Sequence, residues 1–154
     1  MPLPSEAKAI PDRITMIPDD YNTEFVGTAE DGRHFFLTTP FEPGDAAGAG
    51  GNEFVALFYW NSNGEFDSME VDEFGSRESM DSAAHDAKMQ ERLNELGEYR
   101  LEQISVAPFS QDAFDSTFGL VPRAPEDPDG IAYVELLPGN YVAYTWPWDG
   151  EYDT

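Results

Sequence analysis

Acidic side chains are the residues of this chain most able to do chemistry, because it has 31 Asp and Glu, two His and no Cys. Carboxylates bind Ca²⁺ in a loop that carries oxygen ligands at positions 1, 3, 5 and 12 and Gly at position 6. Around Gly64, positions 3, 5 and 12 are suitable, but position 1 is Tyr59. Around Gly130, positions 1 and 12 are Pro125 and Leu136. Turn formation explains both segments better than calcium binding.

Catalytic patterns are also incomplete. His85-Asp86 resembles the metal-binding pair of some phosphohydrolases, but such sites need more ligands, and the only other histidine is His34. Two carboxylates could hydrolyse a glycoside, yet chance pairs are certain among so many acids. No nucleophile elbow, phosphate-binding loop or dinucleotide fingerprint is present. We therefore predict no catalytic residue, no metal site, no cofactor and no enzymatic activity, with a carboxylate-based enzyme as an alternative.

The charge indicates the kind of partner. The net charge is -23 and the pI is about 4.1, yet 40% of the residues are hydrophobic and 14% are aromatic. This composition predicts a folded acidic protein, not a disordered arm. Such a charge repels nucleic acids and anionic membranes and favours a basic protein partner. Two alternatives stay open: a nucleic-acid mimic that occupies the basic groove of a DNA-binding protein, and an acidity that reflects only a high-salt host.

Two acidic clusters are candidate partner-binding sites. The first follows a predicted strand, precedes the predicted helix and consists of Asp67, Glu70, Asp72 and Glu73. The second consists of Asp19 and Asp20. Both could pair with Arg and Lys of a partner, or they could be solvated strand ends and turns. Because the total charge exceeds what solubility requires, the first interpretation stands level with the second.

Turn signals predict the strands that position these acids. Asp31-Gly32 indicates a hairpin between Phe25–Thr28 and His34–Thr39. The turn at 61–64 indicates a second hairpin, between Phe54–Trp60 and the strand that begins at Glu65. A third is expected where Pro138-Gly139-Asn140 joins Ile131–Leu137 to Tyr141–Trp146. Further strands are expected at Ile14–Ile17, Glu102–Ala107 and Ser116–Val121.

One helix is predicted, over Glu78–Leu96, with Ser76 as its N-cap and Gly97 just past its end. Its apolar side chains divide into two nearly opposite faces: Met80, Ala83, Ala84 and Ala87 on one, and Met89, Leu93 and Leu96 on the other. Either the helix kinks near Lys88, or its small face touches a second surface. The order of elements predicts an α+β fold, an antiparallel sheet of hairpins with this helix on one face.

The length of 154 residues suits a single domain, 1–154. We expect an irregular acidic lead-in over 1–24, a mobile Gly- and Ala-rich loop over 43–52 and a docked aromatic tail over 146–154. The start lacks the apolar region of a signal peptide, and no apolar stretch is long enough to cross a membrane. With no cysteine, these features predict a cytoplasmic protein.

Four segments carry a resemblance to a known family. They are PDRI at 11–14, FVGTAEDGRHFF at 25–36, FVALFYWNSNGEFDSMEV at 54–71 and the ending PWDGEYDT. Through them the chain resembles, over most of its length, the bacterial proteins named formate hydrogenlyase regulatory protein HycA-like. The resemblance implies regulation of formate hydrogenlyase expression through a protein partner, with no catalytic residues to carry over. No helix-turn-helix or basic stripe supports direct DNA binding. We predict a regulatory or inhibitory binding protein, including an immunity-type protein that neutralises a basic toxin.

Overall fold

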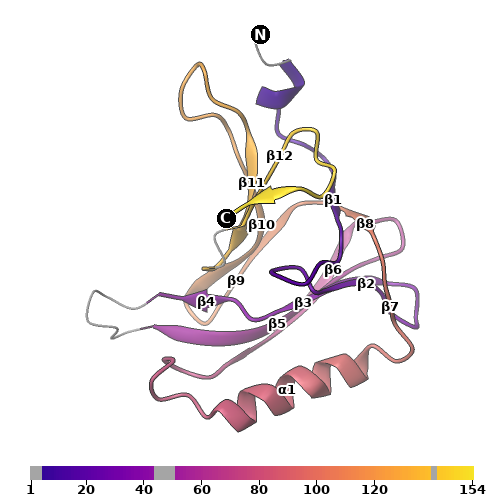
Figure 1. Ribbon diagram of the computed structural model, residues 1–154, viewed down its shortest axis with the longest axis vertical. Coiled ribbons are helices and arrows are strands. Elements are labelled where there is room, and N and C mark those ends of the chain that lie inside the picture. The colour runs from indigo at the N-terminus through magenta and orange to yellow at the C-terminus, as the bar shows by residue number, and fades with distance from the viewer. Residues whose placement is uncertain (1–4, 44–50, 140–141) are drawn as a thin grey trace.

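Two antiparallel sheets pack against each other, and a single helix lies along the outer face of the larger sheet (Figure 1). The computed structural model describes residues 5–43, 51–139 and 142–154. The larger sheet contains β2 (Phe25–Thr28), β3 (His34–Thr38), β4 (Phe41–Glu42), β5 (Asn52–Trp60), β6 (Phe66–Glu73) and β7 (Arg100–Leu101). The smaller sheet contains β9 (Phe109–Ala113), β10 (Ser116–Arg123), β11 (Tyr133–Leu137), β12 (Ala143–Thr145) and β13 (Tyr152–Asp153). A separate pair is formed by β1 (Ile14–Met16) and β8 (Ile104–Val106), and a short 3₁₀ helix, η1 (Ser5–Lys8), precedes them.

The α+β class predicted from the sequence is confirmed, and β5 shows why its apolar run is continuous. Phe54 and Phe58 project into the main core between the two sheets. Val55 and Leu57 project to the other face, into a second core beneath the helix. Successive side chains of a strand point to opposite faces. A strand that is covered on both faces therefore needs an apolar residue at every position.

β3 and β4 behave as one interrupted strand along β5. Thr38 pairs with Ala56, and Phe41 resumes the same register opposite Glu53. Between them, the carbonyl of Pro40 still accepts a hydrogen bond from the Phe54 N–H at 3.0 Å. Proline has no N–H to donate, so the ladder weakens at this point. After this interruption, β4 lies at the corner of the sheet, beside the start of β5.

All three predicted hairpins are present as β2–β3, β5–β6 and β11–β12. In the second, Trp60 pairs with Phe66 while Tyr59 pairs with Ser68, so Asp67 forms a β-bulge. The turn of the third hairpin includes residues 140 and 141, which lie outside the described residues. Four of the described strands were not predicted: β4, β7, β9 and β13.

The prediction of where the helix begins is wrong. Helix α1 spans Ser82–Glu95, and its N-cap is Asp81, whose side chain accepts hydrogen bonds from the backbone N–H groups of Ala83 and Ala84. Ser76 instead contacts Ser79 in the turn before the helix. Asp81 is the N-cap because Ser76 is held in the preceding turn, and the Asp81 carboxylate accepts hydrogen bonds from two free N–H groups of the first turn.

The helix runs without a break through Lys88. Only one of its two apolar faces packs against the sheet. Met89 and Leu93 pack against the second core, together with the buried Leu96. The alanine face is exposed, and Gly97 ends the helix with φ of 72°. No helix among the described residues is long and apolar enough to span a membrane.

The tail and the lead-in touch each other. Trp148 packs against the main core, and its carbonyl accepts a hydrogen bond from the Thr15 N–H at 3.0 Å. Tyr152 pairs with Tyr144 in the smaller sheet, whereas Trp146 remains 39% exposed. Most of the loop expected over 43–52 lies outside the described residues, and Asn52 already begins β5.

Candidate functional site

Three of the four acids predicted on the second hairpin are paired with cations of this chain. Asp67 Oδ2 lies 3.2 Å from Arg33 Nη1. Glu70 and Asp72 stand opposite Leu57 and Val55 in the register, so they face α1. There Arg92 approaches them at 3.3 and 2.7 Å. Successive side chains of a strand point to opposite faces of the sheet. The structure therefore does not bring these four acids together as one open surface.

The remaining predicted acids differ in their surroundings. Glu73 has an amide partner, because it accepts a hydrogen bond from Asn52 Nδ2 at 3.0 Å. Asp19 accepts hydrogen bonds from the backbone N–H of Tyr21 and Thr23 and from the hydroxyl of Tyr152. Asp19 therefore organises its own loop, while Asp20 beside it is exposed.

Every Lys and Arg side chain, all of them among the described residues, contacts another part of the chain. Lys8 donates to the Pro128 carbonyl and Arg13 to the Asn63 carbonyl. The other six pair with carboxylates and are Arg33, Arg77, Lys88, Arg92, Arg100 and Arg123. Because the chain has eight Lys and Arg in total, the charge left for a partner is negative.

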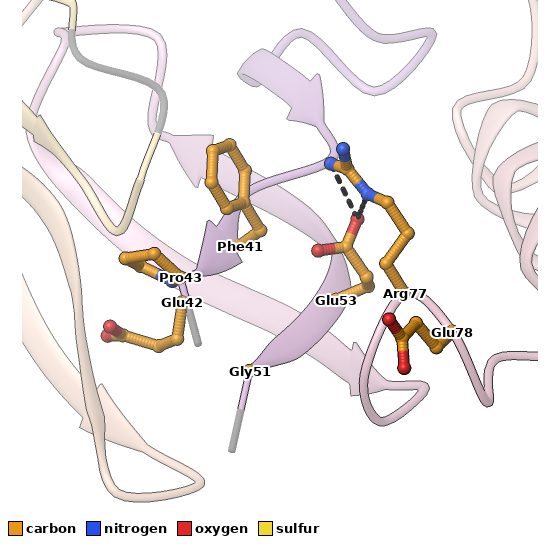
Figure 2. Close-up of a pocket in the computed structure, with 7 residues that line it drawn as sticks. All are labelled: Phe41, Glu42, Pro43, Gly51, Glu53, Arg77 and Glu78. Carbon is orange, nitrogen blue, oxygen red and sulfur yellow. Dashed lines mark hydrogen bonds and ion pairs between the residues drawn. The ribbon is translucent and has the colours of Figure 1, made fainter. Parts of the chain in front are cut away.

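A hollow of about 290 Å³ lies beside β4, at the corner of the larger sheet (Figure 2). Arg77 crosses it, with Nη2 3.2 Å from Glu53 Oε1 and the guanidinium carbon 5.6 Å from the centre of the Phe41 ring. Glu42 and Glu78 line the same hollow. In Figure 2 the Glu42 carboxylate points away from the Arg77–Glu53 pair. The hollow thus holds one guanidinium between a carboxylate and an aromatic ring, with two further acids at its margin.

A second hollow of about 570 Å³ adjoins the first and shares Glu42 and Pro43 with it. Glu73 and Asp115 also line it, together with Asn52, Phe114 and Ser116. No Lys or Arg is among the described residues that form it. We call the two adjoining hollows, which meet at Glu42 and Pro43, the acidic groove.

The turn between β9 and β10 supplies Phe114 and Asp115 to the groove. Ala113 pairs with Ser116, so the loop has only two residues, and their φ values are 51° and 61°. Two-residue hairpin turns require such left-handed conformations, which Asn and Gly adopt most readily. Phe114 is 45% exposed, and its ring lies 6.3 Å from that of Phe54 in the core. Sequence reasoning missed this pair because Phe-Asp is not a typical turn signal.

A separate ionic cluster lies between α1 and the sheet, toward the other end of β5. Arg92 contacts Glu95 on its own helix at 3.7 Å, in addition to its two partners on β6. The Tyr59 hydroxyl donates to Glu95 Oε2 at 3.5 Å. Burial, followed by contact with Glu70, raises the pKa of Glu95 to about 7, although Arg92 and Tyr59 oppose this shift. Burial also raises the pKa of Tyr59 to about 12. This cluster holds the helix in place.

The groove could bind an organic cation. Among the described residues, no group of three or more His, Cys, Asp and Glu has the arrangement needed to hold a metal ion. Carboxylates beside an aromatic face suit a guanidinium, which is planar, donates several hydrogen bonds and stacks on rings. No family model, curated protein or solved structure matches the chain.

Proposed function

We propose that this protein is a non-catalytic acidic binding protein that recognises a basic segment of a protein partner in the acidic groove. One observation carries the proposal: Glu42, Glu73 and Asp115 line the same hollow, and no described Lys or Arg lines it. Like charges held close together repel one another, and an incoming cation relieves that repulsion. A partner cation therefore gains more here than at the acids already paired within the chain.

The neighbouring hollow supports arginine as the preferred cation. There the chain's own Arg77 lies between Phe41 and Glu53. The second hollow offers the same two chemical groups, since it has the Phe114 ring and three carboxylates. Arg stacks on aromatic rings and binds carboxylates with two N–H groups, whereas Lys presents a single strongly hydrated charge.

We propose a regulatory or inhibitory role because the acidic groove would cover a basic surface of the partner. A partner whose cationic segment fills the groove cannot use that segment elsewhere. This holds if the partner is a regulator, and equally if it is a toxin for which this chain is the immunity protein. The resemblance to the HycA-like family, which implies action through a protein partner, points the same way. We propose the bacterial cytoplasm as the compartment, because a chain without cysteine needs no oxidising environment.

Photo-crosslinking from the groove tests this proposal. Benzoylphenylalanine replaces Phe114 in one variant and Trp146 in the control, because these side chains are similarly exposed, at 45% and 39%. After irradiation of cells that make the protein, we expect position 114 to capture an Arg-rich protein that position 146 does not. Mass spectrometry of the adducts identifies it.

Absence of an adduct at position 114, or the same adducts from both positions, would contradict the proposal. Once the partner is purified, competition with DNA separates two kinds of inhibitor. Release of the partner from DNA would show a nucleic-acid mimic, and binding beside DNA would show a regulator that acts on another surface.

A further inference from the structure

The first hollow of the acidic groove already contains a guanidinium group, which belongs to the chain itself (Figure 2). Arg77 donates hydrogen bonds from Nε and Nη2 to Glu53 Oε1, at 3.4 and 3.2 Å. Its guanidinium carbon lies 5.6 Å from the centre of the Phe41 ring. A carboxylate and an aromatic face are the two groups that suit a guanidinium. This part of the groove is therefore a guanidinium site that holds an internal occupant.

The groups that form this site are fixed by the larger sheet. Glu53 of β5 pairs with Phe41 of β4 in the register. The Glu53 N–H donates to the Gly75 carbonyl at 2.7 Å, and the Glu53 carbonyl accepts from the Phe74 N–H at 2.8 Å. The Glu53 side chain is only 15% exposed. A carboxylate with so little contact with water needs a cation beside it, from this chain or from a partner.

The occupant is held less firmly than the site. Arg77 belongs to the turn between β6 and α1, and its side chain is 73% exposed. Two backbone bonds close this turn, from the N–H groups of Ser79 and Met80 to the Ser76 carbonyl, and neither involves Arg77. An ion pair with so exposed a member contributes little to stability. The Arg77 side chain can therefore leave Glu53 at a small cost, without unfolding the turn.

Another arginine of the chain shows the geometry of a closely held guanidinium. Arg33 Nε lies 2.8 Å from Asp31 Oδ2, and its guanidinium carbon is 3.7 Å from the centre of the Tyr59 ring. The Arg33 side chain is 34% exposed. Strong guanidinium–carboxylate bonds are about 2.7–2.9 Å long and use both carboxylate oxygens. Arg77 makes two longer bonds to a single oxygen and lies farther from its ring, which leaves room for a better-placed guanidinium.

The charge around the site also favours an additional cation. Glu42 and Glu78 line the same hollow as Glu53, and Arg77 is the only Lys or Arg among the described residues that line it. Three carboxylates therefore share one guanidinium. An arginine that arrives from outside and sends Arg77 toward solvent keeps Glu53 paired, and the positive charge of Arg77 stays close to the other two acids.

We infer that Arg77 is a stand-in for an arginine of the partner, so that the acidic groove contains two arginine sites, one open beside Phe114 and one at Glu53 and Phe41 that Arg77 occupies until the partner displaces it. The inference rests on the proposed function. It adds that the partner's basic segment presents two arginines, and that Arg77 weakens the binding of any segment with only one.

Removal of Arg77 tests the second site. In an NMR titration with N-acetyl-arginine amide, the amides of Phe41 and Glu53 should respond in Arg77→Ala at about a threefold lower concentration than in the parent, because a weak internal competitor is gone. Arg100→Ala is the matched control. Arg100 is also 73% exposed and lies beside a carboxylate, that of Glu102. Its removal takes away the same charge and should leave the response of Phe41 and Glu53 as in the parent.

No gain at Phe41 and Glu53 in Arg77→Ala, or an equal gain in Arg100→Ala, would overturn the inference. Displacement is also measurable in the unaltered protein. When the probe saturates Phe41 and Glu53, the Nε–H of Arg77 should exchange with water faster, because its bond to Glu53 is lost. An unchanged exchange rate at saturation would show that the probe binds beside Arg77 and would likewise overturn the inference.

The turn at 114–116 separates this inference from the proposed function. If its amides respond in all three proteins while Phe41 and Glu53 gain nothing in Arg77→Ala, the groove stands and the stand-in role of Arg77 is wrong. If Phe41 and Glu53 gain the response while the turn stays silent, the guanidinium site stands and the open site beside Phe114 is wrong.

Discussion

Ending the chain after Thr145 should lower the free energy of unfolding by about 4 kcal/mol. The removed segment contains Trp148 and Tyr152, which both pack partly buried against the main core. It also removes two contacts to the lead-in, the bond from the Thr15 N–H to the Trp148 carbonyl and the bond from the Tyr152 hydroxyl to Asp19. The tail thus joins the smaller sheet to the start of the chain.

Urea unfolding followed by circular dichroism measures this loss without depending on tryptophan fluorescence. Trp146→Ala is the control, because this side chain is 39% exposed and should change stability by less than about 1 kcal/mol. An unfolding midpoint that is unchanged after truncation would show that the tail only rests on the surface.

Phe54→Ala should cost about 3–5 kcal/mol, because it removes a fully buried ring from the core. Phe54 is 0% exposed, and its ring lies 4.9 Å from Phe118 and 6.3 Å from Phe114. The same ring therefore supports both the packing of the two sheets and the wall of the acidic groove. We expect the variant to lose the fixed position of Phe114 together with its stability.

Phe114→Ala separates these two effects. Its ring is 45% exposed, so its removal should cost less than about 1 kcal/mol. Thermal and urea melts of both variants provide the comparison. Equal losses of stability would mean that Phe114, too, is a core residue, and the groove would lose its aromatic wall as a binding feature.

The sequence predicts those parts of the fold that depend on local chemistry. The Asn-Gly and Asp-Gly turns set two hairpins correctly, and the apolar run of β5 indicates a strand covered on both faces. The exact start of α1 is not predictable from cap residues alone, because Ser76 and Asp81 are both suitable. Asp81 prevails because the chain before it is held in a turn by contacts of Ser76 and Ser79.

The candidate site depends on contacts between distant parts of the chain. Arg92 pairs with Asp72, 20 positions away, and with Glu70, 22 positions away. These pairs remove two of the predicted acids from the open surface. Asp115 and Glu42 meet because a two-residue turn of one sheet faces the corner of the other. No spacing in the sequence indicates that meeting. Only Glu73 belongs to both the predicted set and the acidic groove.

The most direct test of the groove is an NMR titration of the ¹⁵N-labelled protein with N-acetyl-arginine amide, and with N-acetyl-lysine amide at the same concentrations. We expect the largest shifts at Glu42, Glu73 and the 114–116 turn, stronger for arginine, and lost when Glu42, Glu73 and Asp115 are replaced by Gln, Gln and Asn. A control with the same loss of charge changes Glu126, Asp129 and Glu151, three exposed acids, and should keep the response. Shifts spread evenly over the acidic surface, or equal loss of response in both variants, would contradict a specific cation-binding groove.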